Sequence, residues 1–210
     1  MKIKEYDLSE YINEDLEVSV DAILNEYGLL ICKDHTKRVA DYIQVLARKF
    51  GYDPEKAKIA ALLHDISGVI PNIKRVEYCK VNHIDLIKEE VELPLIAHQK
   101  TSSHMAKIQF DIHDQEILSA IACHTTLKKD ASKLDKLLFI ADKIEWDQSG
   151  LPSYKKMVED LLEDSLEEAI YAYMKYNLEG GLLKVVHPDY LEAVTWLEAE
   201  LKNKTTRRVK

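Results

Sequence analysis

Residues 61–65 read ALLHD and residues 137–145 read LLFIADKIE, and these two stretches decide the fold. His64 and Asp65 close a run of small and apolar residues in the first stretch, and Asp142 lies inside such a run in the second. A buried carboxylate without a partner is costly, so an aspartate in an apolar helix needs a cation or strong hydrogen-bond donors beside it. Both stretches therefore predict helices that carry polar side chains into an apolar core.

The rest of the chain has the same helical period. Leu16, Val20 and Ile23 fall on one face at about 100° per residue, and similar stripes recur along the sequence. The chain has 6 glycines and 5 prolines, which argues against a turn-rich β architecture. The pattern predicts an all-α fold. We expect helical segments over 16–27, 35–50, 54–67, 73–80, 82–91, 94–109, 115–125, 133–146, 153–176 and 189–201.

Charge and cysteine content exclude several classes of protein. The chain carries 29 Lys and Arg residues against 37 Asp and Glu residues, so its net charge is −8. A nucleic-acid-binding protein usually has the opposite balance, and we expect no nucleic-acid partner. No apolar run reaches the roughly 18–20 residues of a membrane helix, and the N-terminus lacks a signal-peptide core. With 3 widely spaced cysteines and no CxxC, the sequence predicts a cytoplasmic protein without a cysteine zinc site.

Histidines provide the strongest chemical signal. The sequence has 8 of them, and His35, His98 and His124 lie on the inward stripes of predicted helices. Together with the carboxylates of Asp65 and Asp142, these imidazoles suggest a shared metal site inside a helical bundle. Imidazole and carboxylate oxygen suit a divalent transition metal such as iron, manganese, cobalt or zinc. Such an ion lowers the pKa of bound water to about 7 and stabilises charge on a phosphoryl oxygen.

The order of these residues resembles that of the HD-domain metal-dependent phosphohydrolases. His35 comes first, the HD pair follows 29 residues later, and Asp142 lies 77 residues after Asp65. The string ALLHD, the CHTT of residues 123–126 and the string LLFIADKIE make the resemblance specific. The additional histidines match the six-ligand variants of that superfamily. The resemblance implies an HD-domain helical bundle with a metal site between the helices.

Within that superfamily the chain is most similar to the YqeK-type symmetrical bis(5'-nucleosyl)-tetraphosphatases. The similarity is carried by His124–Thr125, by ADKIE at 141–145 and by VVHPDYLEA at 185–193. It implies metal-dependent hydrolysis of diadenosine tetraphosphate to two ADP, with iron as the preferred metal. It also divides the chain into an N-terminal extension at 1–15, an HD-type phosphohydrolase domain at 16–200 and a basic tail at 201–210.

The resemblance also implies roles for individual residues. It assigns metal ligation to His35, His64, Asp65 and Asp142. It gives a second ion, where one is bound, to His98 and His124. The implied catalytic residues are Asp65, His98 and His124. The implied substrate contacts are His98, His124, Thr125, Lys143 and His187. Whether the site holds one ion or two stays open at this point.

Three departures from the family pattern leave the substrate open. Gly68 replaces a basic residue three positions after the HD aspartate, HQKTSSH at 98–104 replaces a glycine-rich stretch, and Gln148 stands where an arginine often follows. Lys100, Lys143, Lys128 and Lys129 are candidates for the replacement charge. One alternative is an HD-type phosphohydrolase of another nucleotide: a nucleoside monophosphate, a dNTP or a guanosine alarmone. A second is a non-catalytic nucleotide sensor. The sequence does not fix the oligomeric state, and a homodimer is among the states considered.

Overall fold

The computed structural model describes residues 6–146 and 150–208, and this part of the chain contains helices and no β-strand. The all-α prediction is confirmed. The elements in chain order are η2 (Ser9–Tyr11), α1 (Leu16–Glu26), α2 (Leu30–Lys49), α3 (Pro54–Leu63), η3 (Ile66–Val69), α4 (Asn72–Val81), α5 (Lys88–Glu92), α6 (His98–Gln109), α7 (Gln115–Cys123), α8 (Lys133–Ile144), α9 (Lys155–Leu162), α10 (Leu166–Glu179) and α11 (Pro188–Arg208).

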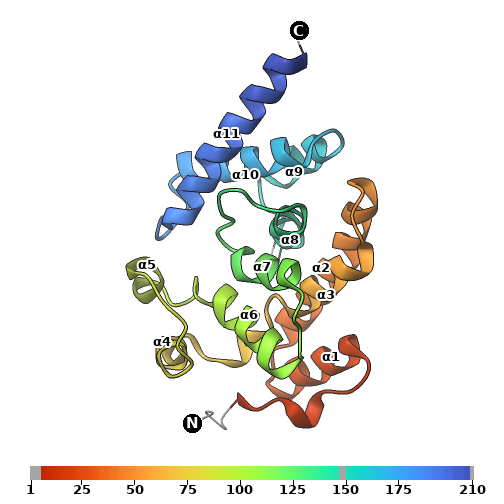
Figure 1. The fold of residues 1–210 in the computed structure, drawn as a ribbon, viewed down its shortest axis with the longest axis vertical. Coiled ribbons are helices and arrows are strands. Elements are labelled where there is room, and N and C mark those ends of the chain that lie inside the picture. Colours follow the sequence, from red (N-terminus) through yellow and green to blue (C-terminus); the bar gives the residue numbers. More distant parts are fainter. Residues whose placement is uncertain (1–5, 147–149, 209–210) are drawn as a thin grey trace.

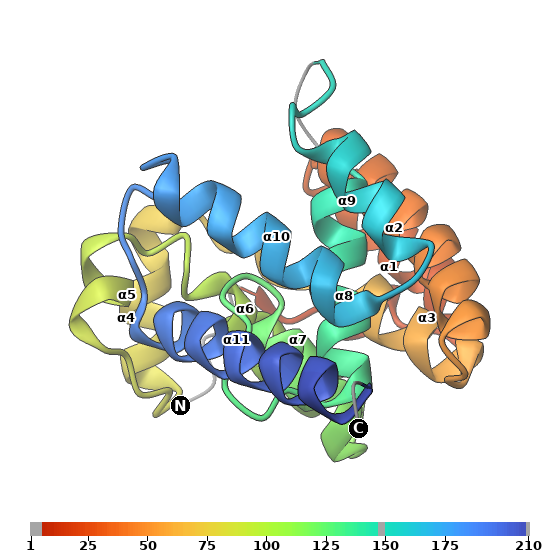
Figure 2. The same cartoon turned by 90° about the horizontal axis from the view of Figure 1, so that it is seen from above.

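Helix α8 occupies the middle of the molecule (Figures 1 and 2). It packs against α2, α3, α7, α9 and α10. Its residues Leu134, Leu137, Leu138, Phe139, Ile140 and Ala141 are all 0% exposed. A helix with buried apolar residues over most of its circumference is stable only when several other helices cover it. The bundle therefore assembles around the segment that carries Asp142.

Side-chain caps fix where several helices begin. Asp53, Asp114 and Ser132 accept hydrogen bonds from backbone N–H groups in the first turns of α3, α7 and α8. These N–H groups have no partner inside the helix, so each cap stabilises a helix start. At the other end of α2, Gly51 adopts a φ of 66°, a conformation that favours glycine. The predicted helix starts at Pro54, Gln115 and Lys133 are confirmed.

Several predicted helices differ from the structure. Helix α2 begins at Leu30, before the expected residue 35, and the helix expected over 54–67 ends at Leu63 and is followed by η3. The single helix expected over 153–176 is wrong: α9 ends at Leu162 and α10 begins at Leu166, because Ser165 caps a new first turn through the N–H of Glu168. The helix expected over 82–91 is reduced to α5, because His83 has a φ of 56° and turns the chain after α4. The helix expected from Pro94 starts only at His98.

The two ends of the chain are tied to the bundle. Gln109 of α6 donates to the carbonyl of Tyr6 and accepts from the N–H of Leu8, and both of these residues are buried in the core. At the other end, α11 continues to Arg208, where the sequence predicted a helix end near residue 201. Its last turns extend beyond the neighbouring helices in Figure 1. The predicted domain boundaries after residues 15 and 200 stay predictions.

No helix within residues 6–146 and 150–208 combines the length and the apolarity that crossing a membrane requires. This agrees with the absence of a long apolar run in the sequence.

The cap of α8 gives a test of the central helix. The fully buried Asp135 accepts from Ser119 Oγ at 2.7 Å, from the Ser132 N–H at 2.8 Å and from Lys128 Nζ at 3.1 Å. Asp135→Ala removes a cap and leaves buried donors unsatisfied, so we expect a loss of about 2–4 kcal/mol in the free energy of unfolding. Asp53→Ala, which removes a solvent-exposed cap, is the matched control and is expected to cost about 1 kcal/mol. Urea unfolding measures both, and equal losses would contradict the central role of α8.

Candidate metal centre and active site

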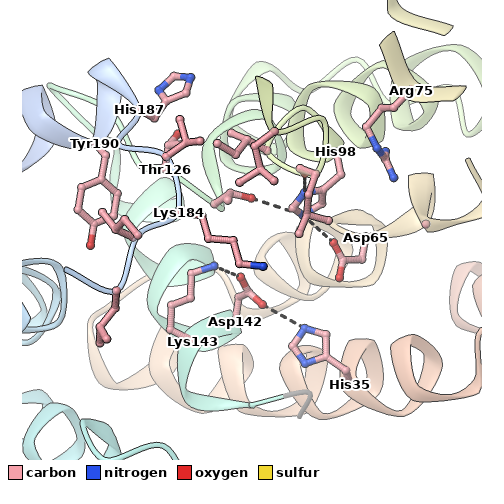
Figure 3. Close-up of a pocket in the computed structure, with 18 of the residues that line it drawn as sticks. His35, Asp65, Arg75, His98, Thr126, Asp142, Lys143, Lys184, His187 and Tyr190 are labelled. Atoms are coloured by element: carbon pink, nitrogen blue, oxygen red, sulfur yellow. Dashed lines mark hydrogen bonds and ion pairs between the residues drawn. The ribbon is translucent and has the colours of Figure 1, made fainter. Parts of the chain in front are cut away.

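Six side chains predicted for the site come from different parts of the bundle and converge beside one cavity (Figure 3). Three of them lie within helices or at a helix start, and the other three lie where a helix has just ended. They are His35 in α2, His64 after α3, Asp65 before η3, His98 at the start of α6, His124 after α7 and Asp142 in α8. The helices therefore deliver these groups from positions up to 107 residues apart in sequence.

One group consists of His35, His64 and Asp142. The Nε2 atom of His35 lies 3.0 Å from Oδ1 of Asp142, and the Nε2 atom of His64 lies 3.8 Å from the same oxygen. The two imidazole nitrogens are 3.3 Å apart. Both histidines are buried, whereas 13% of the Asp142 side chain is exposed. These three donor atoms are close enough to share one ion.

A second group forms around Asp65. Its Oδ1 atom lies 3.1 Å from Nε2 of His98 and 3.6 Å from Nε2 of His124, while its Oδ2 atom lies 3.5 Å from Nε2 of His64. The two oxygens of Asp65 therefore face different groups of histidines. A carboxylate in this position can bridge two ions, whereas the one free nitrogen of His64 can ligate one ion only.

All four histidines are held in the same tautomer. Each places Nδ1 at 2.5–2.8 Å from a backbone carbonyl oxygen: Glu145 for His35, Ala61 for His64, Leu95 for His98 and Ile121 for His124. A carbonyl oxygen only accepts, so Nδ1 carries a hydrogen, and in the neutral ring Nε2 keeps its lone pair. This hydrogen bond to the second ring nitrogen is characteristic of histidines that bind metals. Burial alone would lower the pKa of His35, but the hydrogen bond and the charge of Asp142 raise it above its usual value.

The Nε2 lone pairs of these histidines show whether a divalent metal fits the site. The Nε2 atoms of His98 and His124 are 2.7 Å apart, although neither carries a hydrogen in this tautomer. Burial lowers the pKa of His124 to about 4, so this ring is neutral at pH 7. Burial alone would raise the pKa of Asp65, but His64, His124 and His98 hold it well below its usual value. Neutral imidazoles and ionised carboxylates are the ligands that a divalent transition metal requires.

The cavity beside these residues measures about 530 Å³. Its lining includes the carboxylates of Asp65 and Asp142 and the cationic side chains of Arg75, Lys143 and Lys184. Lys143 pairs with Asp142, and Figure 3 shows the Lys184 side chain reaching toward the same carboxylate. A divalent ion at the site would add two positive charges, so the cavity is suited to an anionic ligand.

Two of these cations were missed from the sequence. Arg75 shares a helix face with the buried Tyr78 and Cys79, and an arginine on an apolar stripe is a signal that could have found it. Lys184 lies in the irregular segment between α10 and α11, and no sequence pattern singles it out. Of the lysines proposed as replacement charge, Lys100 pairs with Glu90 and Lys128 with Asp135, and Lys143 lies at the cavity.

The remaining predicted residues have distinct environments. Thr125 lines the cavity, and its Oγ1 atom is 3.4 Å from Nε2 of His98. His187 also lines the cavity, but its Nδ1 accepts from the N–H of Asp189 and its Nε2 faces Oε1 of Glu90 at 3.6 Å. Gly68 lines the cavity next to the metal-ligand candidates. Gln148 lies outside the described residues.

A family model described as HD domain matches residues 33–147, which is more than half of the chain. The chain belongs to the HD domain family. Membership implies the binding of a divalent metal, in agreement with the convergent histidines and aspartates. A solved structure from Clostridium acetobutylicum, described as a predicted HD superfamily hydrolase involved in NAD metabolism, matches with a TM-score of 0.77 and 26% identity. That match covers 86% of this chain and 96% of the other.

Relatives known from sequence agree with this family. An uncharacterized protein in the pepC 5' region of Lactococcus lactis subsp. cremoris is 45% identical over 146 residues, covering 70% of this chain and 74% of the relative. A symmetrical bis(5'-nucleosyl)-tetraphosphatase of Bacillus subtilis is 28% identical over 167 residues, covering 78% and 87%. The resemblance to HD-domain phosphohydrolases stated from the sequence is confirmed.

Because the two oxygens of Asp65 lie beside different histidines, we predict a site for two ions. We expect native protein, purified without chelator and reconstituted with Mn²⁺, to hold two ions per chain, and His124→Ala to hold one. The reason is that His124→Ala leaves only Asp65 and His98 for the second ion. His113→Ala is the control, because His113 is exposed and pairs with Asp111. Plasma mass spectrometry gives the stoichiometry, and one ion in both the native protein and His124→Ala would contradict the two-ion arrangement.

Proposed function

We propose that this protein is a metal-dependent phosphohydrolase that cleaves diadenosine tetraphosphate symmetrically into two ADP. The observation that carries the proposal is Asp65, whose two oxygens face two groups of histidines at the edge of a cavity with three cationic side chains. The name of the Bacillus subtilis relative supports the substrate, because this chain covers most of its length.

The proposed ligands of the first ion are His35, His64, Asp142 and Asp65. The second ion would use His98 and His124, with Asp65 shared between the two. When bound, a divalent ion acts as a Lewis acid that lowers the pKa of water and stabilises negative charge on phosphoryl oxygens. The donor set admits iron, manganese, cobalt and zinc, and the sequence resemblance favours iron.

The protein's own residues supply orientation and proton transfer. Asp65 lies between the histidine groups and accepts a hydrogen bond from a water that attacks phosphorus in line. In a one-ion form of the site, His98 protonated at both ring nitrogens would give its Nε2 proton to the leaving phosphate, because 17% of its side chain is exposed and it lines the cavity. His124 is 1% exposed and has a lowered pKa, so it serves as a ligand.

Positive side chains hold the phosphate chain. Lys143 and Lys184 lie beside Asp142, where each can form a charge-assisted hydrogen bond to a phosphate oxygen (Figure 3). Thr125 offers a hydroxyl at the His98 side of the cavity. His187 contributes its ring to the cavity wall, since its nitrogens face Asp189 and Glu90. We place the reaction in the cytoplasm, in keeping with the buried Cys79 and Cys123 thiols.

A second candidate is hydrolysis of another nucleotide by the same site. It is favoured by Gly68, which removes a basic side chain that the resemblance implies at the cavity wall. A shorter phosphate chain or a guanosine alarmone would then be the substrate. The non-catalytic sensor is the remaining alternative, and turnover separates it from both enzymes.

The products of diadenosine tetraphosphate test the proposed reaction. We expect the Mn²⁺- or Fe²⁺-loaded protein to release ADP alone. Asp65→Asn is expected to lower kcat by at least about 100-fold, because the substitution removes the charge that faces both histidine groups. His113→Ala keeps the native rate. Ion-exchange chromatography identifies the nucleotides, and ATP plus AMP, or tight binding without turnover, would refute this function.

Lys184 gives a second kinetic test. Lys184→Met is expected to raise KM for diadenosine tetraphosphate about 3- to 10-fold with little change in kcat, because it removes one partly solvated contact to phosphate. Lys202→Met is the matched control, since Lys202 lies on α11 and pairs with Glu198. A KM that is unaffected by Lys184→Met would place this side chain outside the substrate site.

A further inference from the structure

We propose that Arg75 forms a second phosphate subsite, on the Asp65 side of the metal centre, which binds the far part of a polyphosphate chain. The inference deepens the proposed function and rests on it for the identity of the substrate. It assigns a ligand-binding role to a residue of α4, a helix that supplies none of the candidate metal ligands.

Arg75 is 3% exposed, yet its side chain lines the cavity. Its Nη1 atom donates to Ser67 Oγ at 2.9 Å and to Thr101 Oγ1 at 2.8 Å. Its Nη2 atom donates to the carbonyl of Ile70 at 2.9 Å, and its Nε atom to Asn72 Oδ1 at 3.4 Å. A guanidinium has five N–H donors, so one Nη2 hydrogen is left without a partner among the described residues.

Every acceptor of Arg75 is neutral. Within residues 6–146 and 150–208, no acidic side chain forms an ion pair with it. Burying an uncompensated charge is costly, and proteins normally pair such a charge or leave it for a charged ligand. Asp65 acts on Arg75 from a distance, but its carboxylate already faces His64 and His98 and would be neutralised further by a bound metal. Arg75 therefore lacks a counter-ion that the protein itself supplies.

The position of Arg75 points to a phosphate group of the substrate as its counter-ion. In Figure 3 it lies beyond Asp65 and His98, whereas Lys143 and Lys184 lie at Asp142, on the other side of the centre. The cations thus flank the metal-ligand candidates. A symmetrical cut of a tetraphosphate leaves two phosphates on each side of the broken bond, and each half then has its own cationic partner. Arginine suits this role, because its remaining Nη2 hydrogen can donate a charge-assisted hydrogen bond to a phosphate oxygen and the guanidinium stays charged.

The cavity wall next to Arg75 is open. Ser67, which accepts from Arg75, precedes Gly68 in η3. A Cβ atom on Gly68 would meet only Leu29 Cδ1 at 3.5 Å and Cys32 Sγ at 3.8 Å, which are ordinary contacts. A side chain at residue 68 is therefore tolerated sterically, and it would lie at the wall of the cavity that Gly68 and Arg75 both line.

Binding of inorganic pyrophosphate to the Mn²⁺-loaded protein tests the subsite by calorimetry. Arg75→Gln keeps an amide donor but loses the charge, and we expect the Kd for pyrophosphate to rise at least 10-fold. Arg75→Lys keeps the charge and is expected to lose no more than about 3-fold. Thr101→Val is the structural control, because it removes an acceptor of Arg75 and leaves the guanidinium in place; its Kd should stay within 2-fold of native. Metal content and thermal midpoint are measured for each variant.

Gly68→Lys tests the same subsite with Arg75 intact. We expect the added ammonium to lower the Kd for pyrophosphate several-fold, even if the Arg75 variants fail to fold. Unchanged affinity in Gly68→Lys, equal affinity in Arg75→Gln and native protein, or a loss in Thr101→Val as large as in Arg75→Gln would overturn the proposal. Because pyrophosphate binding needs no turnover, a protein that fails to cleave diadenosine tetraphosphate refutes the proposed function and leaves this test unaffected.

Discussion

The structure depends on hydrogen bonds that turn four imidazoles the same way. His64, His98 and His124 each bond a carbonyl three residues earlier in the chain, at or next to a helix end. The carbonyls of Ala61 and Leu95 also accept from the backbone N–H of His64 and His98, so the ring and the backbone of one histidine share a carbonyl and the orientation of the imidazole is fixed. His35 bonds Glu145 instead and ties α2 to α8. The consequence is a centre where four lone pairs and two carboxylates meet, an arrangement that a cation stabilises.

This constraint explains why the sequence could indicate which side chains converge in the bundle. A histidine that follows an apolar run, as in ALLHD, marks a helix end and a buried position at once. Asp142 could be placed because a run of buried apolar residues, Leu137 to Ala141, directly precedes it on α8. The order of ligands in the HD-domain family then linked His35 to His64–Asp65 and to Asp142. Each of these signals depends on residues that are neighbours in the chain, so it can be recognised from the sequence alone.

What the sequence did not predict depends on tertiary packing. The break between α9 and α10 follows from one capping serine, Ser165, inside a pattern that continues the helical period. Lys184 reaches the cavity only because the segment between α10 and α11 crosses it, and no periodicity encodes that crossing. The pairing of His187 with Glu90 of α5 joins elements whose proximity appears only in the folded chain. In each case the sequence shows the type of residue, but it does not show which group that residue contacts in the folded chain.

The charge distribution connects the fold to its ligand. The chain as a whole carries a net charge of −8, yet its cavity gathers Arg75, Lys143 and Lys184 around two carboxylates. An acidic exterior weakens non-specific attraction to nucleic acids, while a cationic cavity with low-dielectric walls concentrates small polyanions. Metal binding strengthens this contrast, because it cancels the two carboxylates and leaves the three cations to face the ligand. A preference for a short phosphate chain over a polymeric nucleic acid then follows from the gathering of these positive charges at the cavity.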